Sequence, residues 1–222
     1  MKIIIANTNQ ILSTIEHKCI KDFNAKIIKT KKQLLSLSSR KVKPDYIFFL
    51  HWSELIPEEI FNTIKCIVFH MTDLPYGRGG SPLQNLIIRG HTSTMISAIK
   101  VEEGIDAGPI YLKRSLSLSG TAEEIFIKAG KIIFKMINEI ISKNPKPVQQ
   151  KGEVVVFKRR KPEESNISSL SNIEQIFDYI RMLDAKGYPH AFIETSNMRM
   201  EFTGALLNKD KTITANVRIS KK

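Results

Sequence analysis

The stretch FHMTDLPYGRGGSPLQNLI, residues 69–87, sets the organisation of the surrounding chain. It continues an apolar run, CIVF (66–69), that stops at His70, and a turn rich in proline and glycine follows. Ser81 and Pro82 then have the residue types favoured at the N-cap and first position of a helix. A buried strand, a turn and a helix in this order are typical of the units that build a mostly parallel sheet.

The composition limits the classes of protein to consider. The 222 residues are enough for one large core, or for one domain with a small appendage. The 34 Lys and Arg residues exceed the 22 Asp and Glu residues, giving a net charge of +12 and a pI near 9.7. This excess favours partners that carry phosphate, such as nucleic acid, nucleotides or anionic lipid, but a generally lysine-rich host proteome explains it equally well.

The cysteines and the hydrophobic runs indicate a compartment. Cys19 and Cys66 both lie in apolar patterns, which predicts two buried free thiols in a reducing environment. The first ten residues lack the apolar core of a signal peptide, and no window approaches the roughly 18 apolar residues of a membrane span. We therefore expect a soluble, cytoplasmic protein without a membrane partner.

Strand-like and helical segments alternate up to about residue 142. A capping box formed by Thr121 and Glu124 predicts the start of the longest helix, and Asn9 is expected to cap the first one. This alternation predicts an α/β fold with a mostly parallel sheet and helices on both faces. Strands are expected at 2–6, 25–30, 45–52, 65–69, 93–100 and 110–118, with helices between them.

The C-terminal part has a different pattern. A turn-rich linker, NPKPVQQKG, precedes a strand near residue 154, and a second capping box, Ser171 with Glu174, predicts a helix. Three strand-like pieces follow between residues 190 and 219. We therefore expect a catalytic domain over residues 1–150 and a small α+β subdomain over residues 151–222.

His70 and Asp106 are the first candidates for chemistry. Ligands of open parallel sheets gather outside the carboxyl ends of the strands, where His70 is expected. Asp106, in the loop EEGIDAGP, precedes another strand and could approach the same rim. A carboxylate that orients an imidazole serves proton transfer and acyl transfer. The spacing alone equally allows a histidine that only bonds at a strand end and an aspartate that only shapes a turn.

Two basic motifs are less informative. The glycine-rich turn GRGG (77–80) could bind an anion through backbone N–H groups and Arg78, but it matches neither the Walker motif nor the dinucleotide fingerprint. The run KRRK (158–161) could contact phosphate or form a solvated edge. Each motif taken alone indicates a turn or an exposed surface and little more.

Taken together, the order of these motifs resembles a known family. His-x-Thr-Asp-Leu-Pro-x-x-Arg-Gly-x-x-Pro, followed by a helix, a strand and Glu-x-Gly-x-Asp-x-Gly, is similar to the formyltransferases that use 10-formyltetrahydrofolate. The resemblance spans residue 45 to about residue 190. Within it, FKRRKPEES and IFDYIRMLDAKGYPHAFI look most like the branch that acts on nucleotide-linked amino sugars, closest to the enzymes of pseudaminic acid biosynthesis.

The resemblance implies a Rossmann-like formyltransferase fold, a reaction and its partners. A formyl group would move from 10-formyltetrahydrofolate to the amine of a UDP- or dTDP-linked amino sugar, such as a UDP-4-amino-4,6-dideoxy sugar. The family uses no metal. A net positive charge also suggests a methionyl-tRNA formyltransferase, but the tail looks too short for that enzyme's tRNA-binding domain, so we do not expect nucleic acid as a partner. A homodimer is left open.

The resemblance also assigns roles to residues. His70 would take the proton of the amine or, as an imidazolium, stabilise the oxyanion, and Asp106 would hold its ring. The pterin would lie between two loops formed by residues Trp52, Leu55, Ile56, Gly104, Ile105 and Asp106. The amine substrate would meet Arg78, Gly79 and Gly80, with Arg159 and Arg160 assigned to a diphosphate on charge alone.

One position departs from the family pattern. The family usually carries an asparagine two residues before the histidine, and this chain has Val68 there. Losing such an oxyanion donor typically costs about 2.7–4 kcal/mol of barrier height. Three explanations stay open: another group substitutes, the pair His70 and Asp106 acts alone, or the chain is a catalytically inactive homologue that binds folate or a nucleotide.

Overall fold

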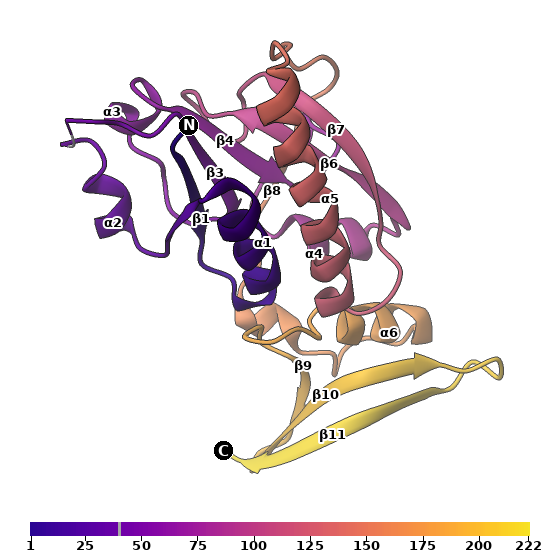
Figure 1. Ribbon diagram of the computed structural model, residues 1–222. Coiled ribbons are helices and arrows are strands. Elements are labelled where there is room, and N and C mark those ends of the chain that lie inside the picture. Colours follow the sequence, from indigo (N-terminus) through magenta and orange to yellow (C-terminus); the bar gives the residue numbers. More distant parts are fainter. Residues whose placement is uncertain (40) are drawn as a thin grey trace. The chain divides into compact units, whose positions relative to one another are not determined.

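The structure is a computed structural model that describes residues 1–39 and 41–222 (Figure 1). The chain forms two compact units, and each is made of segments that are distant in sequence. Unit 1 comprises residues 1–79, 94–116 and 126–156, and unit 2 comprises residues 80–93, 117–125 and 157–222.

A six-stranded sheet forms the centre of unit 1, in the order β2-β1-β3-β4-β6-β7. The first four strands are parallel, and β6 pairs with β4 in the antiparallel direction, so the sheet is mixed. The predicted α/β class is therefore confirmed. The strands are β1 (Ile3–Asn7), β2 (Lys26–Ile28), β3 (Tyr46–His51), β4 (Lys65–His70), β6 (Ser93–Lys100) and β7 (Ile110–Ser117).

Helices pack on both faces of this sheet because its inner strands are apolar on both faces. Residues 4, 6, 47 and 49 face a core shared with α2 (Lys31–Leu35) and α3 (Glu58–Phe61). On the other face, α1 (Ser13–Phe23) packs against α5 (Ala122–Lys143) (Figure 1). Gly130 allows this close approach, since a Cβ there would lie 2.8 Å from Ile15 Cγ1.

Most of the predicted helix starts in this part of the chain agree with the structure. The Asn9 side chain accepts a hydrogen bond from the Ile11 amide and caps the short 3-10 helix η1 (Gln10–Leu12). The Thr121 and Glu124 side chains each accept a bond from the other's amide, forming the predicted capping box. A short strand that we did not predict, β5 (Tyr76–Gly79), pairs with β8 (Val155–Phe157).

Unit 2 combines three helical segments with an antiparallel sheet in the order β11-β10-β9. The helices are α4 (Pro82–Ile88), η2 (Pro162–Ser165) and α6 (Ile173–Arg181). The strands are β9 (Ala191–Glu194), β10 (Met198–Leu207) and β11 (Ile213–Lys221), so the three predicted pieces are present and two of them are longer than expected.

Two helix caps in unit 2 differ from the prediction. Asn172, rather than Ser171, caps α6, because it adopts an extended backbone and accepts a bond from the Gln175 amide. Ser81 does precede α4, but its backbone is left-handed and its hydroxyl makes no capping bond. That hydroxyl accepts a hydrogen bond from the Arg160 amide at 3.0 Å instead.

Both cysteines are buried free thiols, as predicted. Burial raises the pKa of the Cys66 thiol to about 12, and burial together with the nearby Asp22 and Glu16 carboxylates raises that of Cys19 to about 12. Among the helices of the described residues, none has the length and apolar character needed to cross a membrane.

Candidate functional site

Strand β4 ends at His70 and fixes its ring between two acceptors. The side chain is only 8% exposed, and its Nε2 atom lies 2.8 Å from the Gly77 carbonyl oxygen. Its Nδ1 atom lies 3.5 Å from Asp106 Oδ2. The structure therefore brings together the two residues that the sequence singled out for chemistry.

The glycine-rich turn closes around this histidine. Gly77 and Gly79 have backbone φ angles of 78° and 101°, which glycine adopts without strain. The Gly77 carbonyl accepts bonds from His70 and from the Thr72 hydroxyl, and the Gly79 amide donates to Asp106 Oδ2 at 2.9 Å. The turn thus supplies an acceptor to the ring and a donor to the carboxylate.

The loop that carries Asp106 is held in place at several points. Asp106 has a left-handed backbone, with φ of 51°, which is uncommon outside glycine. A Cβ at Gly108 would lie 1.8 Å from the Lys100 carbonyl oxygen, so the loop lies directly against the end of β6. The Gln150 side-chain amide donates to the carbonyl oxygens of Asp106 and Gly108, both at 2.8 Å.

These contacts restrict how His70 can carry protons. A carbonyl oxygen only accepts, so Nε2 must bear a proton. In the neutral ring the Nδ1 lone pair then faces the Asp106 carboxylate, whereas in the imidazolium both nitrogens donate to an acceptor. The arrangement therefore suits a histidine that becomes protonated during a reaction, with a carboxylate that stabilises the charge. The Asp106 side chain is 17% exposed and is therefore more accessible to solvent than that of His70.

The residues assigned to the pterin offer apolar surface and an unused donor. Leu55 and Ile105 are 75% and 65% exposed, although both are large and apolar. Trp52 packs edge-on against Phe49, and its indole N–H is buried without a hydrogen-bond partner within residues 1–39 and 41–222. The assignment of these residues to the pterin stays a prediction.

The residues assigned to the amine substrate fall in both units. In unit 1, Arg78 donates two hydrogen bonds to the Gln150 side-chain oxygen, at 3.2 and 2.8 Å. In unit 2, the backbone of Arg159 lies so close to Gly80 that a Cβ there would be 2.7 Å from Arg159 Cα. Arg159 is exposed, whereas Arg160 lies over the Tyr179 ring and donates to the Glu164 carbonyl oxygen.

Two positions complete the picture of the site. Val68 lies on the same face of β4 as His70, is half-buried and packs against the core beside α2 and α3. Its side chain has no amide group, so this position does not provide the donor that the family's asparagine would provide.

Gln150 was missed in the sequence, because a lone glutamine in a turn-rich linker gives no periodic or motif signal.

Two pockets of unit 1 are lined by other residues. One of about 280 Å³ is lined by Glu58, Phe61, Asn62, Lys100, Val101, Glu102 and Glu103, none of which we assigned to the site. Over the described part of the chain, no group of three or more His, Cys, Asp or Glu side chains is arranged to hold a metal ion.

Two family models match the sequence. The model described as "Formyl transferase" matches residues 6–125, which include His70 and Asp106. The model described as "Methionyl-tRNA formyltransferase, C-terminal domain" matches residues 162–220. The second match covers most of the segments that we expected to resemble the amino-sugar branch, and it lies in the tail that we expected to be too short for a methionyl-tRNA formyltransferase.

Similar proteins carry related names. A solved structure named methionyl-tRNA formyltransferase from Clostridium thermocellum is 52% identical, with a TM-score of 0.93, and the match covers 100% of both chains. A methionyl-tRNA formyltransferase from Clostridium botulinum is 26% identical over 182 residues, which are 78% of this chain and 58% of that protein. The chain spans between 49% and 63% of the length of the first eight curated relatives.

More distant structures share the fold. HypX from Aquifex aeolicus, solved in complex with tetrahydrofolic acid, is 17% identical with a TM-score of 0.75, and covers 92% of this chain and 38% of HypX. A 4-N formyltransferase from Francisella tularensis is 18% identical with a TM-score of 0.62, over 97% and 96% of the two chains. With a family model covering more than half of its residues, the chain belongs to the formyl transferase family.

Proposed function

We propose that this protein transfers a formyl group from 10-formyltetrahydrofolate to a primary amine. The observation that carries the proposal is the contact of His70 with Asp106, 3.5 Å apart at the end of β4. The formyl transferase family uses 10-formyltetrahydrofolate, and the match to that family includes both residues.

The chain's own residues would act by position and charge. Charge develops on the formyl oxygen as the amine adds, and a protonated His70 would stabilise it electrostatically. The Asp106 carboxylate would balance the charge on the ring and fix its orientation through the bond to the Gly79 amide. Contact of His70 Nε2 with the reacting group requires the Gly77 carbonyl to release it, and the glycines on either side of Arg78 give the turn that freedom.

For the amine acceptor, the first candidate is methionyl-tRNA. It is supported by the 52% identity with the Clostridium thermocellum protein of that name and by the match over residues 162–220. These findings favour this acceptor over the amino sugar that the sequence motifs first suggested.

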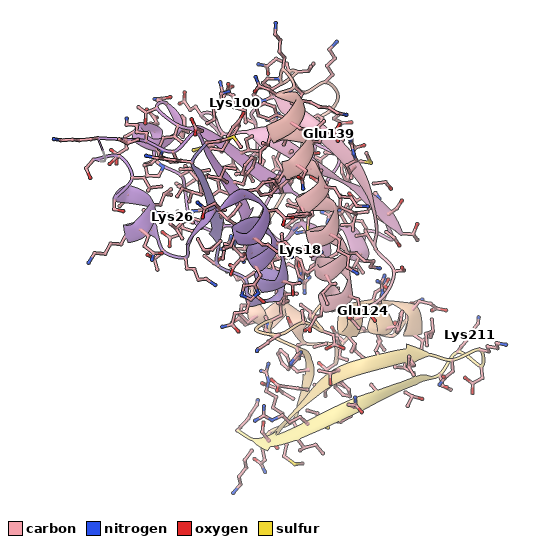
Figure 2. The ribbon with its side chains drawn as sticks, viewed as in Figure 1. Lys18, Lys26, Lys100, Glu124, Glu139 and Lys211 are labelled. Atoms are coloured by element: carbon pink, nitrogen blue, oxygen red, sulfur yellow. The ribbon has the colours of Figure 1, made fainter. Side chains whose placement is uncertain are left out.

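The distribution of charge also favours a polyanionic acceptor. Residues 17–43 contain eight lysines and one acidic residue, Asp22. All eight lysines are exposed, on α1, β2, α2, the segments that join them and the segment between α2 and β3, and Figure 2 labels Lys18 and Lys26 among them. Because β2 is the first strand in the sheet order, no strand of residues 1–39 and 41–222 lies beyond it at this edge. A concentration of lysines along one edge attracts phosphate backbones.

A nucleotide-linked amino sugar is the second candidate. The match to the 4-N formyltransferase covers 97% of this chain and 96% of that one, so the two have similar extents. The exposed Arg159, with its backbone against Gly80, offers a cation for a diphosphate. In this alternative the sugar amine would take the place of the methionyl amine.

One experiment separates the candidates. The purified protein is incubated with 10-formyltetrahydrofolate and, in parallel, with methionyl-tRNA and with a panel of UDP- and dTDP-linked amino sugars, and the products are identified by mass. Formyl-methionyl-tRNA alone supports the first candidate, and a formylated sugar alone supports the second. Formylation of none of these amines, together with a thermal shift by folate, would favour an inactive binding protein and contradict the proposal.

A further inference from the structure

Gln150 makes an unusual set of contacts for a residue in a linker. Its side-chain oxygen accepts two hydrogen bonds from the Arg78 guanidinium, at 3.2 and 2.8 Å. Its side-chain nitrogen donates to the carbonyl oxygens of Asp106 and Gly108, both at 2.8 Å. A glutamine amide has two donor hydrogens and two acceptor sites, so all of its hydrogen-bonding capacity is used.

These four bonds join three separate segments of unit 1. Arg78 lies on β5, between the glycine whose carbonyl contacts His70 and the glycine whose amide contacts Asp106. Asp106 and Gly108 belong to the loop that places the carboxylate beside the ring. Gln150 comes from the linker after α5 and bridges the strand and the loop.

The loop needs such a support. Asp106 has a left-handed backbone, which a non-glycine residue keeps only where surrounding contacts hold it. The Gln150 amide bonds to the carbonyl of this strained residue and to the carbonyl two residues later. Among the described residues, the hydrogen bond that would still hold Asp106 without Gln150 is the one from the Gly79 amide to its carboxylate.

We propose that Gln150 is a positioning residue that ties Arg78 to the loop of residues 102–108 and so holds Asp106 against His70. Gln150 acts through Asp106 and does not contact the reacting atoms. This inference rests on the proposed function for its catalytic consequence, and it deepens that function by adding a residue to the same site. A displacement of about 1 Å in a reacting group can lower a rate by roughly 100-fold.

The test compares three variants of the full-length protein. Gln150→Met removes all four bonds at similar volume. Gln150→Glu keeps an acceptor for Arg78 but removes the two donors to the loop. Gln149→Met makes the same change at the neighbouring position, which is exposed and makes no side-chain hydrogen bond to any residue the structure describes, so it serves as the matched control.

We expect Gln150→Met and Gln150→Glu each to lower kcat for formyl transfer at least tenfold, with less than a threefold change in KM for the amine. Gln149→Met should retain the wild-type kcat. The glutamate variant distinguishes positioning from general stabilisation, because it keeps the bond to Arg78. A glutamate variant with wild-type kcat would overturn the proposal.

Hydrogen exchange gives a readout that does not depend on activity. Amides in peptides covering residues 102–109 should exchange at least fivefold faster in both Gln150 variants than in the wild type and in Gln149→Met. Equal exchange in all four proteins would overturn the positioning role. If the wild type formylates none of the tested amines, the proposed function fails, and the exchange rates still decide the role of Gln150.

Discussion

Replacement of Asp106 by asparagine tests the electrostatic role of the pair. The amide has the shape of the carboxylate, and its oxygen can still accept the bond from the Gly79 amide. The change therefore removes the negative charge beside His70 and leaves most of the local packing. We expect kcat for formyl transfer to fall while the unfolding temperature stays near that of the wild type.

The size of the effect follows from the geometry. Two unit charges 3.5 Å apart attract by about 5 kcal/mol at an effective dielectric constant of about 20. The Asp106 side chain is 17% exposed, and solvent screening lowers this value to roughly 2–3 kcal/mol. If that attraction stabilises the protonated ring only in the transition state, kcat should fall by roughly 30- to 150-fold.

The assay measures initial rates of formyl transfer under saturating 10-formyltetrahydrofolate, with the accepted amine varied. Glu59→Gln, which neutralises an exposed carboxylate on α3, is the matched control and should retain the wild-type rate. An Asp106→Asn variant within threefold of the wild type, with an unchanged unfolding temperature, would refute the electrostatic role.

Three further predictions use other contacts. His70→Ala should abolish transfer while circular dichroism and the unfolding temperature show an intact fold, and near-wild-type turnover would contradict the assigned role. Gly108→Ala should lower the unfolding temperature and the rate, because its Cβ would lie 1.8 Å from the Lys100 carbonyl oxygen, and an unchanged unfolding temperature would contradict this. The pKa of both thiols is raised to about 12 in the folded protein, so unfolded thiols ionise first. The free energy of unfolding, from urea titrations, should therefore fall as the pH rises from about 9 toward 12, and less so in Cys66→Ala.

The fold was largely predictable because its signals are local. Each buried strand of the parallel part is a short apolar run, and burial on both faces leaves that run with few polar residues. Thr121 with Glu124 marks the start of α5 by residue type and spacing alone. Where two residues suited to capping are adjacent, as at Ser171 and Asn172, the sequence does not distinguish them, and the backbone conformation decides.

The site was predictable in its residues but not in its geometry. Strand β6 runs antiparallel to β4, so Lys100 lies opposite Ile67 and the strand ends away from His70. The loop after β6 must therefore fold back across the sheet to bring Asp106 to the ring. No periodic pattern encodes such a return, so position alone left the meeting of the two residues open, and the family motif assigned them to one site. The bonds that support the loop, from Gln150, join positions more than 40 residues apart and leave no sequence signature.

The stretch 69–87 provides more than the histidine itself. Gly77 gives the ring an acceptor, Gly79 gives the carboxylate a donor, and Arg78 between them is bonded to the glutamine that supports the Asp106 loop. Each contact uses a backbone group or a side chain of the same four-residue strand. A shift of β5 would therefore alter the surroundings of the ring, of the carboxylate and of the loop together.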